Sequence, residues 1–294
     1  MRPGPFAYAA PDSIDEALYL LAQHGDEAKV LAGGQSLIPL MRLRLANPGL
    51  VVDITRVSDL DYVRVEAGAL RIGALVRHRK LETVTLSPEW RILPIAARNV
   101  AHLPIRFRGT FGGSIAHADP AAELPLVAQT LGAKMHLRSR KAQRVVDCGD
   151  FFRSFFTTNL RSDEILTEVA LQAPPSGVHS AFLEFSRRPG DFAVVATAAL
   201  VHVDAAGVCD WCRLGLAGVA ATPIRLTSLE GELIGQPFNP RRLDSTVDAA
   251  MADFRSLGDV HADTHYRSHL SAVLLKRALH QIAGTLVGEH RKEI

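Results

Sequence analysis

One stretch of this chain, residues 108–131 (RGTFGGSIAHADPAAELPLVAQTL), constrains the fold more than any other part of the sequence. Three glycines, Gly109, Gly112 and Gly113, stand there among small hydroxyl residues, and Asp119-Pro120 then opens an apolar run. Because glycine has no Cβ, such a backbone can bend tightly and come close to a ligand. The stretch therefore has the composition of a ligand-binding loop.

A shorter segment upstream repeats this pattern. Val30 to Ala32 is an apolar strand that runs into Gly33-Gly34-Gln35-Ser36-Leu37. A strand that ends in paired glycines and a hydroxyl presents successive backbone N–H groups, and such an array binds anions, the more so where a helix follows. An ordinary strand-to-helix turn is the alternative for this loop taken alone. Two such loops in one domain favour one polyanionic ligand that is held from two sides.

Two common nucleotide-binding motifs are absent. The sequence contains neither G-x-G-x-x-G nor G-x-x-x-x-G-K-[ST], which disfavours a doubly wound NAD domain and a P-loop NTPase. In the longer stretch, Asp119 and Glu123 can accept hydrogen bonds from a ribose or an adenine, although Asp119 can equally serve only as a helix cap. The loops together favour a dinucleotide cofactor.

Composition excludes several classes of partner. Lys and Arg total 33 against 31 Asp and Glu, a net charge of +2, so nothing favours nucleic acid or an acidic membrane surface. No window approaches the roughly 18 unbroken apolar residues of a membrane span, and the N-terminus lacks the apolar core of a signal peptide. Three cysteines form no disulfide framework. We therefore expect a soluble, cytoplasmic protein, and its 294 residues predict two domains.

The first 175 residues alternate between helical and strand patterns. Helices are expected over residues 12–25, 37–45, 76–84, 94–102 and 120–131, and strands over 28–32, 50–54, 60–75 (two or more, with a turn at 66–68), 134–137, 144–147 and 165–171. A strand is the alternative over residues 40–45. For the helix at 120–131, Asp119 can cap, Pro120 suits the first position and Gly132 can end it, but Pro125 allows a later start.

After residue 175 the pattern of predicted elements changes. Pro174-Pro175-Ser176-Gly177 is the best linker in the sequence. Strand-like patterns follow over residues 181–185, 193–203 and 213–219, and then helices, one opened by Thr222-Pro223 and others over 228–233 and 266–287. The sequence thus predicts an α+β protein in which a mixed ligand-binding domain precedes a small antiparallel sheet with helices.

Other motifs that could carry chemistry are better explained by structural roles. Cys209 and Cys212 form a lone C-x-x-C in a strand without two further ligands, so a metal or redox role is disfavoured. His261, His265 and His269 recur every fourth residue, which fits a solvated helix start. His117 has no nucleophile nearby and is interpreted as packing. No catalytic triad, carboxylate pair or H-E-x-x-H motif is recognised.

Three segments resemble a known family, the medium, FAD-binding subunit of the molybdenum hydroxylases, which include carbon monoxide dehydrogenase and xanthine dehydrogenase. They are AGGQSL at 32–37, GTFGGSIAHADP at 109–120 and RRPGDFA at 187–193, in the family's order and spacing. The resemblance covers nearly the whole chain. One departure is Leu183, which stands where xanthine dehydrogenases place a lysine.

The resemblance implies a particular fold. It is a p-cresol-methylhydroxylase-type FAD-binding domain over residues 1–175, made of two α/β subdomains (about 1–55 and 56–175), with a C-terminal flavoprotein subdomain over 176–294. This division agrees with the change of texture near Pro174.

The resemblance also implies the cofactor contacts. Ala32, Gly33, Gly34, Gln35, Ser36 and Leu37 would hold the FAD pyrophosphate through backbone amides, with Thr110, Gly113 and Ser114 on the phosphates from the other side. Asp119 and Glu123 would lie near the pyrophosphate and ribose, the Leu166 backbone near the flavin, and Phe192 beside the isoalloxazine. Ala101, Gly109, Gly112 and Ala118 complete the implied site, which has no catalytic residue and no metal.

By the same resemblance, the chain passes electrons within a complex. A large molybdopterin subunit would hydroxylate the substrate, a small subunit with two [2Fe–2S] clusters would relay the electrons, and FAD here would pass them to NAD+, a quinone, oxygen or another acceptor. The assembly would be a dimer of heterotrimers. Three scattered cysteines are too few for a cluster of the chain's own. A stand-alone flavin oxidoreductase of this fold and a non-catalytic nucleotide-binding module are the alternatives.

Overall fold

The computed structural model describes residues 2–290, which form two compact units. The first comprises residues 2–81, 102–118 and 132–172, and the second comprises 82–101, 119–131 and 173–290. Two segments that precede the predicted domain boundary at residue 175 therefore belong to the second unit. That boundary along the chain stays a prediction.

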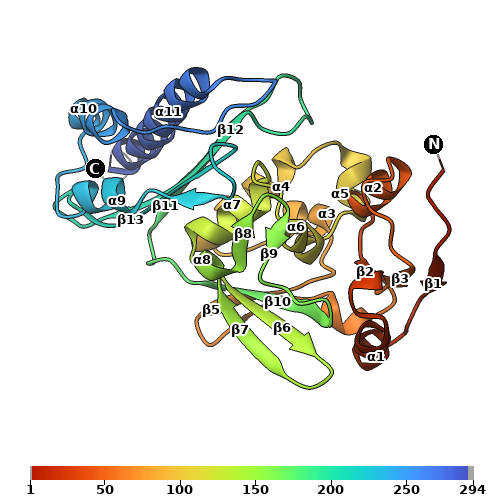
Figure 1. The fold of residues 1–294 in the computed structure, drawn as a ribbon. Coiled ribbons are helices and arrows are strands. Elements are labelled where there is room, and N and C mark those ends of the chain that lie inside the picture. Colours follow the sequence, from red (N-terminus) through yellow and green to blue (C-terminus); the bar gives the residue numbers. More distant parts are fainter. Residues whose placement is uncertain (1, 291–294) are drawn as a thin grey trace. The chain divides into compact units, whose positions relative to one another are not determined.

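The first unit begins with a small parallel sheet in the order β1-β3-β2 (Figure 1). Its elements are β1 (Ala7–Ala9), α1 (Ile14–His24), β2 (Ala28–Leu31), α2 (Leu37–Arg42) and β3 (Leu50–Asp53), with a 3-10 turn at Gly25–Glu27. Parallel strands of one sheet require crossover connections; α1 connects β1 to β2 and buries Leu18 and Leu21 against the sheet, and α2 connects the neighbours β2 and β3. The predicted helices and strands of this region are confirmed, and the alternative strand over 40–45 is wrong.

An antiparallel sheet of five strands forms the rest of the first unit's framework, in the order β4-β5-β10-β6-β7. Its strands are β4 (Val63–Glu66), β5 (Ala69–Gly73), β6 (Lys134–Ser139), β7 (Gln143–Asp147) and β10 (Glu164–Gln172), and a small hairpin adds β8 (Phe152–Ser154) and β9 (Thr157–Thr158). The strands predicted at 60–75, 134–137, 144–147 and 165–171 are confirmed. The alternation of buried and exposed residues that predicts them follows from the period-two geometry of a strand.

Short helices connect these strands. They are α3 (His78–Thr83), α5 (Leu103–Arg108), α6 (Phe111–His117) and α8 (Cys148–Phe151), with 3-10 turns at Ser58–Leu60 and Pro88–Trp90. The glycines predict a loop over residues 109–118, and this prediction is wrong. Thr110 caps a helix there, since its side-chain oxygen accepts a hydrogen bond from the Gly113 N–H. Gly112 and Gly113 thus lie in a first helical turn.

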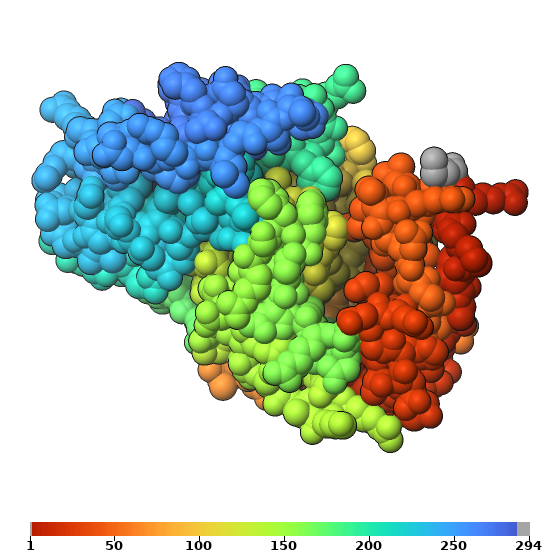
Figure 2. Space-filling view, viewed as in Figure 1, coloured from red at the N-terminus to blue at the C-terminus, as the bar shows by residue number. Residues whose placement is uncertain are grey.

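The second unit has a core of its own, between a four-stranded antiparallel sheet and helices. The elements are α4 (Ile92–Asn99), α7 (Glu123–Thr130), β11 (His179–Phe185), β12 (Val195–Val203), β13 (Cys209–Ala217), β14 (Ile224–Arg225), α9 (Thr227–Leu233), α10 (Pro240–Met251) and α11 (Thr264–His290). Figure 1 shows α11 running along the sheet, and Figure 2 shows the outer surface of α10 and α11 in blue. The antiparallel sheet with helices was predicted.

Two helix predictions in this unit need correction, and one helix was not predicted. The helix at 120–131 starts at Glu123, because a start at Pro120 would place Pro125 where a helical N–H must donate to the carbonyl four residues back. Asp119 therefore does not cap it; its side chain accepts from the Ala121 N–H at 2.9 Å. Thr222-Pro223 opens the strand β14 rather than a helix, and α10 was missed because its sequence is largely polar.

Candidate cofactor-binding site

The first glycine loop, residues 32–37, presents a row of free backbone donors. Within the described part of the chain, no hydrogen bond uses the N–H groups of residues 33–37. Gly34 has φ +73°, a left-handed conformation that favours glycine. The Gln35 side chain donates to the Gly33 carbonyl at 3.0 Å, which holds the loop in shape. The loop therefore has the donors that an anion requires.

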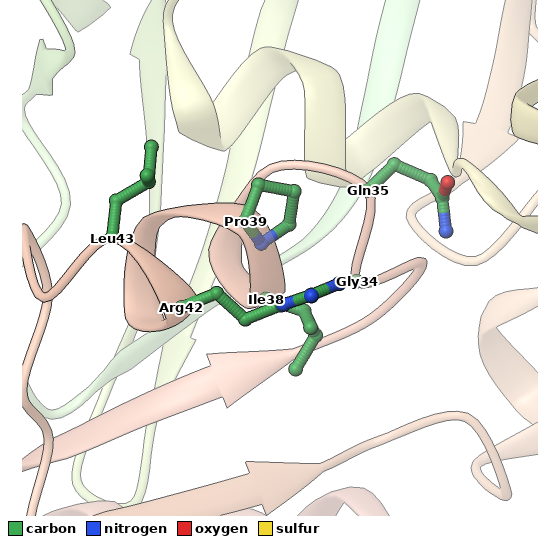
Figure 3. Close-up of a pocket in the computed structure, with 6 residues that line it drawn as sticks. All are labelled: Gly34, Gln35, Ile38, Pro39, Arg42 and Leu43. Carbon is green, nitrogen blue, oxygen red and sulfur yellow. The ribbon is translucent and has the colours of Figure 1, made fainter. Parts of the chain in front are cut away.

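A pocket of about 510 Å³ lies beside this loop (Figure 3). It is lined by Gly34, Gln35, Ile38, Pro39, Arg42 and Leu43. The sequence predicts the helix that carries the last four residues, but it does not assign them to the site. Their spacing of three and four residues places them on one face of α2, and this helical periodicity was the signal that could have found them.

The second glycine segment, residues 109–118, contacts the first loop directly. A Cβ built on Gly33 would lie 2.5 Å from the Arg108 carbonyl oxygen and 2.7 Å from the Gly109 Cα. Real Cβ atoms essentially never come so close to backbone atoms. The structure thus brings the two glycine segments together in one unit, as the sequence predicts.

In the second segment, Gly109 and Gly112 are required by packing within the protein rather than by close approach to a ligand. A Cβ on Gly109 would lie 2.5 Å from the His78 ring, and one on Gly112 would lie 2.5 Å from the Ala74 Cβ. His78 is buried, and burial lowers its pKa to about 4, so the ring is neutral at pH 7. These glycines permit close packing of protein on protein, which positions α6 beside the first loop.

The backbone donors of the second segment are largely used within the protein. The Phe111 N–H donates to the Val76 carbonyl at 2.8 Å and the Gly112 N–H to the Ala74 carbonyl at 2.9 Å. The Gly113 N–H donates to the Thr110 side chain at 3.1 Å. Ser114 is half-buried, and its hydroxyl makes no hydrogen bond to any described residue. Of the implied phosphate contacts in this segment, the Ser114 hydroxyl is therefore free, and the Thr110 hydroxyl, which only accepts, keeps its O–H donor.

Thr110→Val should destabilise the chain by about 1–2 kcal/mol, because the half-buried Gly113 N–H loses its acceptor while the side-chain volume is kept. Urea unfolding, followed by circular dichroism, measures the change. Thr110→Ser keeps the hydroxyl and should unfold within about 0.5 kcal/mol of the unmodified chain. Equal stabilities of the valine and serine variants would show that the cap is unimportant.

Two further implied contacts lie in the first unit. Leu166 is buried on β10 beside an irregularity in the pairing with β6, where the register shifts before Glu168. Ala118 ends α6 with φ +54°, and its carbonyl accepts from the Phe156 N–H at 3.2 Å. Both residues thus occupy irregular backbone, which is frequent at functional sites.

The other four implied contacts lie in the second unit. Ala101 follows α4 with φ +41°. Asp119 and Glu123 belong to the turn before α7 and to its first residue. Phe192 is 67% exposed in the loop between β11 and β12. An exposed aromatic ring of this size is suited to covering a planar ligand.

Glu123 has a carboxyl group whose pKa is raised by its surroundings. Its side chain is only 5% exposed; burial first, and then the nearby Glu184 charge, raise its pKa to about 8. Burial raises the pKa of Glu184 to about 7, and its Oε2 is among the described buried atoms without a hydrogen-bond partner. At pH 7 the Glu123 carboxyl can therefore donate a hydrogen bond as well as accept one.

The remaining motifs lie outside this site. The His117 ring lies tilted against that of Phe156, with the ring centroids 5.1 Å apart, in agreement with a packing role. Cys209 and Cys212 are buried free thiols on β13, and no group of three or more metal-binding side chains occurs among the described residues. Of the three spaced histidines, His261 precedes α11. None of the described helices has both the length and the apolar composition needed to cross a membrane.

The fold and the glycine loop define a protein that binds a nucleotide cofactor, and sequence models identify its family. Residues 4–174 match the FAD-binding domain in molybdopterin dehydrogenase, and residues 180–282 match the C-terminal domain of the CO dehydrogenase flavoprotein. The chain therefore belongs to the family of FAD-binding subunits of molybdenum hydroxylases, and its predicted cofactor and fold are confirmed.

Individual relatives agree with this assignment over their whole length. Subunit alpha of the 6-hydroxypseudooxynicotine dehydrogenase complex of Paenarthrobacter nicotinovorans is 39% identical, with 95% of each chain aligned. The carbon monoxide dehydrogenase medium chain of Afipia carboxidovorans is 34% identical over 95% of this chain and 97% of its own. The crystal structure of quinoline 2-oxidoreductase from Pseudomonas putida 86 superposes with a TM-score of 0.91 at 34% identity, covering 97% of this chain and 99% of that one.

Proposed function

We propose that this chain is the electron-transfer subunit of a molybdenum hydroxylase complex. It takes electrons from [2Fe–2S] clusters of a partner subunit and passes them through FAD to an acceptor. The observation that carries the proposal is the free N–H row of residues 33–37 beside a pocket, in a chain of the FAD-binding family. The described cysteines are buried and too few for a cluster, so a [2Fe–2S] cluster that supplies the electrons would belong to a partner.

The residues of the first unit fit a pyrophosphate. Backbone N–H groups of residues 33–37 would bind the phosphate oxygens, and the Ser114 hydroxyl would add a donor from the second segment. When bound, the flavin supplies the redox chemistry, accepting electrons singly and releasing them to the acceptor. The contacts from Asp119, Glu123, Leu166 and Phe192 belong to the same proposal. The protein's part is to bind, orient and cover the cofactor.

The names of the relatives support the proposed partners. Those proteins are called a subunit of a dehydrogenase complex, the medium chain of a dehydrogenase and the medium subunit of a hydroxylase. We infer a large molybdopterin subunit, which selects the substrate, and a small subunit with two [2Fe–2S] clusters, in a dimer of heterotrimers. The acceptor is NAD+, a quinone, oxygen or another oxidant, and nucleic acid is not a partner.

Purified under native conditions, the chain should be yellow and should release FAD on denaturation, yet it should not oxidise the substrate of the complex. Absorbance and chromatography of the released flavin test the first statement. Co-expression with the neighbouring genes, followed by metal analysis, tests the second: molybdenum and iron should co-purify. A flavin-free chain that cannot be reconstituted would refute the proposal, and substrate turnover by the chain alone would favour the stand-alone oxidoreductase.

A further inference from the structure

Arg42 is the charged residue among the six that line the pocket beside the first glycine loop. It lies at the end of α2, eight residues after Gly34 and four after Ile38. Since residues four apart in a helix share a face, Ile38 and Arg42 both face the pocket. Figure 3 shows the Arg42 side chain extending along the helix toward Gly34, whereas Gln35 points away from it.

Arg42 has no protein partner within the described part of the chain: no hydrogen bond or ion pair involves its guanidinium. Several other arginines of the first unit are engaged. Arg77 donates to the Arg108 carbonyl, Arg71 pairs with Glu168, and Arg144 pairs with Glu164 at 2.7 Å. Arg42 is thus a cation whose five N–H donors are uncommitted and which faces the pocket.

We propose that Arg42 binds the pyrophosphate of the cofactor. This inference rests on the proposed function, and it adds a side-chain charge to a site otherwise made of backbone donors and a hydroxyl. The N–H groups of residues 33–37, before α2, would donate hydrogen bonds to one set of phosphate oxygens. The guanidinium of Arg42, at the other end of α2, would donate to another set. Its planar fork matches two phosphate oxygens at once.

The adenine is the other part of the cofactor that a guanidinium can contact, by stacking. The phosphate is favoured because the pocket joins Arg42 to the loop with the free N–H groups, and because no carboxylate among the lining residues neutralises the cation. The pyrophosphate carries two negative charges, which need a cation close by. An ion pair of this kind weakens with ionic strength, whereas stacking does so far less.

Arg42→Gln tests the assignment, with Arg42→Lys to restore the charge and Arg44→Gln as the matched control. Arg44 is exposed, two residues further on, and does not line the pocket. FAD affinity is measured on the deflavinated full-length chain by flavin fluorescence at low and high salt. Arg42→Gln should bind FAD about tenfold more weakly at low salt and lose much of the salt dependence. Arg42→Lys should recover part of the affinity and all of the salt dependence, and Arg44→Gln should bind like the unmodified chain.

The outcomes separate this inference from the proposed function. If the unmodified chain binds FAD and Arg42→Gln binds it equally well with the same salt dependence, the assignment of Arg42 is wrong while the proposed function stands. Weaker binding with an unchanged salt dependence, and no recovery in Arg42→Lys, would assign Arg42 to the adenine and also overturn the inference. If the unmodified chain binds no FAD, the proposed function itself fails. Circular dichroism of each variant verifies that the chain is folded.

Discussion

Gly33→Ala should abolish flavin retention and destabilise the chain by about 3 kcal/mol. The new methyl group would lie 2.5 Å from the Arg108 carbonyl oxygen, which is backbone and cannot rotate away. Relief requires the first glycine loop and the second glycine segment to separate, which disrupts the N–H row. Loss of two charge-assisted hydrogen bonds alone would weaken FAD binding by about a hundredfold. Flavin fluorescence titration and urea unfolding measure the two effects.

Gly149→Ala is the matched control for this substitution. Gly149 lies in α8 of the same unit, and a Cβ there would meet no atom within 4 Å. Alanine at that position should keep the flavin and change stability by no more than about 1 kcal/mol, in the stabilising direction, because alanine favours a helix. If Gly33→Ala keeps its flavin and unfolds like the control, the contact between the two glycine segments is needed neither for flavin binding nor for stability.

The sequence predicted the site at the level of segments but not of atoms. Paired glycines after an apolar strand indicated the first glycine loop, because its free N–H groups follow from backbone geometry alone. The sequence predicts a loop for the second glycine segment, since glycine disfavours helices. Its glycines instead satisfy long-range contacts with Ala74 and His78, which no local pattern encodes.

The residues of the pocket and the buried carboxyls of the second unit also depend on long-range contacts, which local sequence patterns do not encode. Arg42 is one of several arginines in a basic, apolar stretch, and only the path of α2 distinguishes it from Arg44. The burial of Glu123 and the approach of Glu184 depend on packing between segments sixty residues apart. Patterns of period two or 3.6 report which side of an element is buried, but not what it is buried against.

Glu123→Gln should change the pH dependence of stability. The folded pKa of Glu123 is raised from 4.5 to about 8, first by burial and then by the Glu184 charge. Above pH 4.5 the unfolded chain releases this proton while the folded chain keeps it. The free energy of unfolding therefore falls as pH rises from 4.5 to 8, by about 1.4 kcal/mol per unit and about 5 kcal/mol in all.

Glutamine keeps the shape of the neutral carboxyl and has no proton to lose. At pH 5 the variant should match the unmodified chain within about 1 kcal/mol, and at pH 9 it should be the more stable by several kcal/mol. Urea unfolding of the deflavinated chain from pH 5 to pH 9 measures the two curves. Glu232→Gln, at an exposed position of α9, reports the effect of the substitution itself. Parallel curves for Glu123→Gln and the unmodified chain would mean that Glu123 is ionised in the folded state.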